Sequence, residues 1–141
     1  MESELMTFIF HTVVYLGASF VLFLLGRLLY DAFNRKIDVK HELIGADNFA
    51  FTLTFVGYFA GLILVIGSTI IGPSRGLAAD VLDILFYGIL AILLLNMSAW
   101  INDKFILRKF SITKEIIADK NNGTGMVVAA NFIASGLIIF G

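Results

Sequence analysis

Residues 49–71 form an apolar stretch without a charged side chain, and no other feature constrains the fold as strongly. About 20 residues of α-helix cross the roughly 30 Å hydrocarbon core of a bilayer. Residues 8–30 and about 81–101 are long and apolar enough to do the same. A fourth stretch, residues 126–141, would give only about 24 Å of helix. The sequence therefore predicts four transmembrane helices. The fourth is either short, or the natural chain continues past Gly141.

The composition indicates an integral membrane protein. The chain is 59% hydrophobic and only 15% charged, whereas soluble domains contain about 25% charged residues. Residues 1–6 lack a positive charge, and the apolar run after them is too long for a cleaved signal peptide. We therefore expect a single all-α integral membrane domain over residues 1–141.

The second half of the chain resembles the first. An acidic-aliphatic-aliphatic triplet occurs at residues 42–44 and again at residues 115–117, and an Asn follows each Glu six positions later. In both halves an apolar run with small residues comes next. The repeating unit is two apolar segments joined by a charged connector, over about residues 8–72 and about 81–141. We predict two parallel repeats, related by a pseudo-two-fold axis along the membrane normal.

The basic residues are placed asymmetrically. If the segments alternate across the bilayer, nine of the ten basic residues fall on the side of the two connectors, and only Arg75 falls on the other. The positive-inside rule then puts both termini outside and both connectors in the cytoplasm, facing anionic lipid headgroups. Residues 104–120 carry Ile106, Phe110, Thr113 and Ile117 at helical spacing, which predicts a short helix at the membrane surface.

The motifs in these two halves resemble a known family. The run ADNFAFTLTFVGYFAGL in the first half and DKNNGTGMVVAANFIASGL in the second are similar to the bacterial family "domain of unknown function 350". Its N-x-A…G-x-x-x-G pattern lies here on Asn48, Ala50, Gly57 and Gly61. The resemblance implies paired two-helix units in the bacterial inner membrane and a link by genome context to envelope-stress and polyamine-related genes. It implies no activity.

Small residues within the helices mark where helices can pack closely, because they let backbones approach. Such packing occurs either inside one subunit or across a dimer seam, and both alternatives stay open. The candidate packing residues are Gly57, Ala60, Gly61, Gly67, Ala134, Ser135 and Gly136.

Four of the polar residues inside the apolar segments are functional candidates, because a charged or amide group in hydrocarbon is costly. His11 and Asp83 lie near the outer ends of helices that run the same way, so they either form a proton-carrying pair or are solvated by headgroups. Arg27 has Asp31 one helical turn later, which predicts an intrahelical pair. Asn96 lies deeper and needs an interhelical hydrogen bond.

The polar residues before the second and fourth helices have two interpretations. An Asn or Asp there can cap the free N–H groups of the helix. Alternatively, the two copies line an acidic cytoplasmic vestibule that attracts cations or a basic partner; the Glu six residues before each Asn motivates this second hypothesis. The candidate vestibule residues are Glu42, Asp47, Asn48, Asn102, Asp103, Glu115, Asp119, Asn121 and Asn122.

Motifs of catalysis do not occur in the sequence. It has no G-x-S-x-G, H-E-x-x-H or P-loop pattern, no Cys and only two His. We therefore expect no enzyme, cofactor, metal site or nucleic-acid partner. The sequence favours a non-enzymatic membrane protein, as an oligomeric scaffold that binds a cytoplasmic protein, and the resemblance implies the inner membrane and an envelope-stress component. The alternative is a small oligomeric ion channel or transporter.

Overall fold

The computed structural model describes residues 2–71, 73–106 and 111–141 of the chain. Four long helices dominate it: α1 (Glu2–Phe33), α2 (Phe49–Ile70), α3 (Leu77–Ile101) and α4 (Asn122–Phe140). Each is long and apolar enough to cross a membrane, and no strand occurs among the described residues. The predicted all-α membrane fold with four transmembrane helices is confirmed.

The helices extend beyond the apolar stretches that predicted them. α1 begins at Glu2, where acidic residues in the first turn suit the positive helix end. α3 begins at Leu77 and carries Asp80 in its first turn. α4 has 19 residues because it begins at Asn122, so the expected start at residue 126 was too late. Its first four residues, Asn-Gly-Thr-Gly, are typical of a loop, yet they form the capped first turn of this helix.

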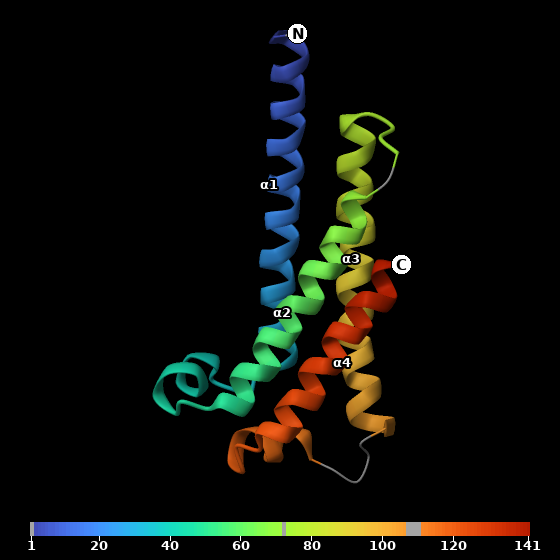
Figure 1. Ribbon diagram of the computed structural model, residues 1–141. Helices are drawn as coiled ribbons and strands as arrows, with labels where there is room; N and C mark the ends of the chain where they lie inside the picture. The colour runs from blue at the N-terminus through green and yellow to red at the C-terminus, as the bar shows by residue number, and fades with distance from the viewer. Residues whose placement is uncertain (1, 72, 107–110) are drawn as a thin grey trace.

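The helices alternate in direction (Figure 1). α1 and α3 run from the end of the molecule that holds the N-terminus toward the opposite end, and α2 and α4 run back. The described parts of both charged connectors, residues 34–48 and 102–121, therefore lie at one end, which we call the connector end. The first turns of α1, residues 2–10, are exposed, with Met6 and Phe8 among their apolar side chains. The two-repeat layout itself stays a prediction.

α2 is the best-buried helix, and α4 crosses it at the closest approach in the bundle. A Cβ on Gly57 would overlap the backbone of Ala129, and one on Gly61 would lie 2.5 Å from the carbonyl oxygen of Phe132. Gly125 is equally close to Ala50. Larger side chains would push the two helices apart, so these glycines let the backbones touch.

The other predicted packing residues lie in different places. Gly136 packs on Gly61, and Ser135 is buried. Ala60 and Gly67 are half-buried, whereas Ala134 is exposed on the outer face of α4. The α2–α4 contact therefore uses part of the predicted set, and it lies inside one subunit.

The connectors contain wide helical turns and not one long surface helix. These turns are η1 (His41–Gly45), η2 (Asn102–Ile106) and η3 (Lys114–Ala118). The predicted surface helix over residues 104–120 is helical at both ends. The described residues do not include Phe110 of its apolar stripe, the basic residues Arg108 and Lys109, or Gly72 of the α2–α3 turn.

Candidate functional site: two connector entrances and two cavities

The first entrance, residues 41–48, turns the chain from η1 into α2. The N–H of Ala46 donates to the carbonyl of His41 at 2.7 Å, and the N–H of Asn48 donates to the carbonyl of Glu42 at 3.0 Å. Asp47 adopts the left-handed conformation, with φ of 46°. The Asn48 side-chain oxygen then accepts the N–H of Phe51 at 3.1 Å, so Asn48 is the cap that its sequence position predicts.

The side-chain amide of Asn48 has two further partners. Its nitrogen donates to a carboxylate oxygen of Glu42 at 2.7 Å and to the carbonyl of Ile116 at 2.8 Å. Asn48 is fully buried, and Glu42 is only 8% exposed. Glu42, six residues before Asn48, therefore holds the capping amide in its orientation.

The second entrance, residues 114–121, repeats these bonds before α4. Asp119 N–H donates to Lys114 at 3.1 Å, and Asn121 N–H donates to Glu115 at 2.8 Å; Lys120 has φ of 47°. The Asn121 oxygen accepts backbone N–H groups of the first turn of α4, and its nitrogen donates to Glu115 at 2.9 Å. Here, however, the Asn is exposed.

Hydrogen bonds also connect the two entrances. Asn48 of the first donates to Ile116 of the second, and the Lys120 ammonium of the second donates to the carbonyl of Ala46 at 2.6 Å. The Glu side chains that would line an acidic vestibule instead bond to the Asn caps beside them.

The remaining candidates are spread over the connector end. Asp47 is exposed, Asn102 ends α3, and Asn122 is the exposed first residue of α4. Asp119 lies 3.8 Å from the Lys114 ammonium, and both side chains are largely exposed, so this pair contributes little to stability. Asp103 lines a cavity described below.

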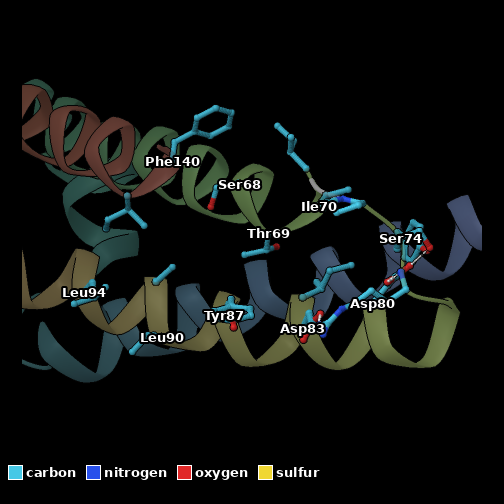
Figure 2. Close-up of a pocket in the computed structure, with 17 residues that line it drawn as sticks. Ser68, Thr69, Ile70, Ser74, Asp80, Asp83, Tyr87, Leu90, Leu94 and Phe140 are labelled. Atoms are coloured by element: carbon cyan, nitrogen blue, oxygen red, sulfur yellow. Dashed lines mark hydrogen bonds and ion pairs between the residues drawn. The ribbon is translucent and has the colours of Figure 1, made fainter.

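A polar cluster closes the opposite end of the bundle (Figure 2). Asp80 accepts hydrogen bonds from the Tyr15 hydroxyl at 2.7 Å, from the Ser74 hydroxyl at 2.5 Å and from the N–H of Arg75 at 2.8 Å. The cluster joins α1 to the α2–α3 turn. Asp83 pairs with the Arg75 guanidinium, so the structure does not bring it together with His11, whose ring packs beside that of Tyr15.

The outer cavity, about 520 Å³, opens beside this cluster. In Figure 2, Ser74 and Asp80 lie at one end, whereas Leu94 and Phe140 lie toward the other. Each of the two carboxylates at the polar end already has a partner. The cavity is therefore amphipathic, with its charged groups occupied.

The inner cavity, about 230 Å³, lies toward the connector end. All four long helices and η3 contribute to its wall. Leu94 of the outer cavity and Asn96 of the inner one are two residues apart, or about 200° around α3. The two cavities therefore lie on opposite faces of α3 and do not form one path.

The polar residues within the helices bond to one another. Arg27 pairs with Asp31 at 3.3 Å, as their spacing predicts, and its guanidinium lies over the Phe55 ring. Asn96 donates to the Tyr58 hydroxyl at 3.2 Å and to its own helix, and that hydroxyl donates to the carbonyl of Gly26 at 2.8 Å. These bonds tie α1, α2 and α3 together. A contact of 2.6 Å between Ser98 and Ser135 links α3 to α4.

Sequence reasoning missed several of these residues. Asp80 had a readable signal, since an acid in the first turn after a Gly-Pro-Ser turn suits a helix start. Tyr15 and Tyr58 had none, because their partners are distant in the chain or are backbone carbonyls. Within the described part of the chain, no group of His, Cys, Asp and Glu could hold a metal ion.

Comparisons with known proteins place these features in a family. The family model described as Domain of Unknown Function (DUF350) matches residues 4–141. A curated relative from Aquifex aeolicus (strain VF5), described as a UPF0719 transmembrane protein, is 29% identical over 115 residues. The match covers 81% of this chain but only 40% of the relative. No solved structure matches the chain.

Proposed function

The chain belongs to the family described as Domain of Unknown Function (DUF350), and from that premise we propose that it is a non-enzymatic scaffold of a bacterial inner membrane. In this proposal it works as a homo-oligomer. Its four helices form a rigid membrane unit, and its basic connectors present a docking surface to the cytoplasm.

The observation that carries the proposal is the bonding of the entrance acids. Glu42 is buried against Asn48, and Asn48 is bonded to Ile116 of the other entrance. A carboxylate that orients a helix cap stabilises one fixed arrangement. It is poorly suited to binding and releasing a transported ion, because its loss leaves a buried amide unpaired.

Oligomerisation is supported by α1. Its first half is apolar, and little of it is buried by the other helices. A Cβ on Gly17 would meet no atom within 4 Å, so this face of α1 is open to close approach by another helix. The relative is longer than its matched part by more than twofold, which leaves room in that chain for a second unit of this size.

Cysteine cross-linking tests this interface, since the natural chain has no Cys. Gly17→Cys in native membranes should give covalent dimers on oxidation, because two copies of α1 would face each other. The matched control is Phe86→Cys, on an exposed position of α3, which should stay monomeric. Single-molecule counting in nanodiscs should show more than one subunit per particle, and a purely monomeric population would refute the scaffold proposal.

The orientation of the connectors also follows from the proposal. Nine of the ten basic residues would face the cytoplasm and its anionic headgroups. Ser74→Cys should react with an impermeant thiol reagent in intact cells, and Ser111→Cys should react only after lysis. Labelling of Ser111→Cys alone would invert the topology and remove the cytoplasmic docking surface.

A small oligomeric transporter is the second candidate, favoured by the two cavities that indent the bundle from opposite ends. In one subunit they are separated by a packed core that includes Leu62, Ile92 and Leu95, each fully buried. Transport would therefore require this core to open or a path to form between subunits. Cation flux into liposomes that contain the oligomer distinguishes the two functions.

A further inference from the structure

The inner cavity has an aromatic wall. Five of its lining residues are aromatic, and they come from all four helices: Tyr30, Phe33, Phe51, Trp100 and Phe132. The faces of aromatic rings carry negative partial charge and attract cations. The chain already uses its rings in this way, since the Lys104 ammonium lies 5.4 Å from the centre of the Trp100 ring.

The side-chain oxygens of Asn34, Asn96 and Asp103 line this cavity and accept no hydrogen bond from a described residue, so they are available to a ligand. The amide nitrogens of Asn34 and Asn96 and the hydroxyl of Thr54 already donate hydrogen bonds within the protein. Among the described residues that line the cavity, Asp103 alone carries a formal charge, and its carboxylate makes no hydrogen bond or ion pair to a described residue.

Tyr30 adds a second observation. Its side chain is 97% buried, since only 3% is exposed, and it lines the cavity. Its hydroxyl has no hydrogen-bond partner among the described residues, whereas the neighbouring Tyr58 hydroxyl has two. The oxygen itself keeps some accessible surface, so a ligand in the cavity could form a hydrogen bond with it.

We propose that this cavity binds a compact organic ammonium ion with one positive charge, free in solution at the connector end. The aromatic rings would surround its alkyl part, and Asp103 would balance its charge. Its N–H groups, where present, would meet the free acceptors. The volume of about 230 Å³ is below the range of roughly 300–1,000 Å³ for drug-sized ligands, which favours a small cation. The proposal does not depend on the scaffold role.

Trp100 allows a direct test because it is the only Trp in the chain and lines the cavity. The purified protein in phosphatidylglycerol nanodiscs is titrated with choline, and Trp fluorescence is followed beside calorimetry. Saturable binding with a fluorescence change is expected. The neutral isostere 3,3-dimethylbutan-1-ol should bind about tenfold more weakly, because it lacks the charge. Equal binding of both compounds, or no saturable binding of choline, would overturn the proposal.

Two variants separate binding from folding. Asp103→Asn should weaken choline binding about tenfold, whereas Asp47→Asn, an exposed carboxylate on the other connector, should leave it unchanged. Tyr30→Phe removes only an unpaired hydroxyl, so its melting temperature should match that of the parent. The variant should weaken the binding of a primary amine such as butylammonium by about threefold. It should weaken the binding of choline less, since choline has no N–H donor. Full affinity in both Asp103→Asn and Tyr30→Phe would show that the cavity is not the site.

The source of the ammonium is tested by the bilayer. Phosphatidylethanolamine carries the same chemical group on a lipid headgroup. Adding it to the nanodiscs should leave choline binding unchanged if the ligand is a free ion. Competition by this lipid would assign the cavity to a headgroup and overturn the free-ion proposal.

Discussion

The two entrances have the same hydrogen bonds but different surroundings. In each, a Glu accepts the amide N–H of an Asn six residues later, and that Asn caps the following helix. Asn48 is fully buried and also reaches Ile116, whereas Asn121 is exposed to solvent. The same Glu–Asn arrangement is therefore a buried cap that also bonds to the other half of the chain in the first entrance, and an exposed cap in the second.

From this difference we expect burial to set how much the same bonds contribute to stability. An exposed amide that loses its partner can bond to water, but a buried one cannot. Asn48 also bonds across to the other half of the chain, so its loss should loosen the whole connector end. Among the described residues, Asn121 bonds only to its own entrance and to the start of α4.

Replacing each of the two Asn residues should give the largest difference in stability between the two entrances. Asn48→Ala leaves the buried Glu42 carboxylate and the Ile116 carbonyl without a donor, so the free energy of unfolding should fall by about 3 kcal/mol. Asn121→Ala should cost only about 1 kcal/mol, the usual value of a cap. Unfolding in mixed micelles, followed by circular dichroism, measures both. Equal losses would mean that burial is not what distinguishes the entrances.

The α2–α4 contact should have the next largest effect, because it holds the two entrances side by side. Gly57→Ala forces a Cβ against the backbone of Ala129, and overpacking of this kind costs about 2 kcal/mol. Gly67→Ala in the same helix is the control, since a Cβ there would lie at an ordinary contact distance of 3.7 Å from the Phe140 ring, and Ala favours a helix by up to about 1 kcal/mol. The same unfolding measurement applies. A Gly57→Ala variant as stable as the parent would show that the helices can separate freely.

Substitutions at the two residues with left-handed backbone conformation should change stability least. Asp47 and Lys120 have φ of 46° and 47°, which costs an L-residue about 1 kcal/mol that Gly avoids. Asp47→Gly should therefore stabilise the protein by about that amount. Lys120→Gly should be nearly neutral, because it also loses the bond from Lys120 to Ala46. Thermal melting of the two variants side by side checks the difference, and an equal gain in both would show that this bond contributes nothing.

Local features of this fold could be predicted from the sequence, and contacts between distant segments could not. The apolar stretches predicted four helices, and capping was one of the two interpretations that the sequence offered for Asn48 and Asn121. The partner of Asn48 is a backbone carbonyl at Ile116, and a backbone atom has no signature in the sequence. The start of α4 was missed because its Gly-rich first turn is typical of a loop. The inner cavity is built by four helices and both connectors, so no single stretch indicated it.

The claim that the entrance acids work in folding and not in transport is tested most directly by the double variant Glu42→Gln with Glu115→Gln. Its free energy of unfolding and its cation flux in liposomes are measured together, beside the parent and protein-free liposomes. We expect a loss of about 1 kcal/mol, most of it from Glu42→Gln, since a neutral acceptor weakens the bond to the buried Asn48. We expect the parent to conduct no more than empty liposomes. A parent that conducts cations, and a double variant that loses this flux with unchanged stability, would contradict the account.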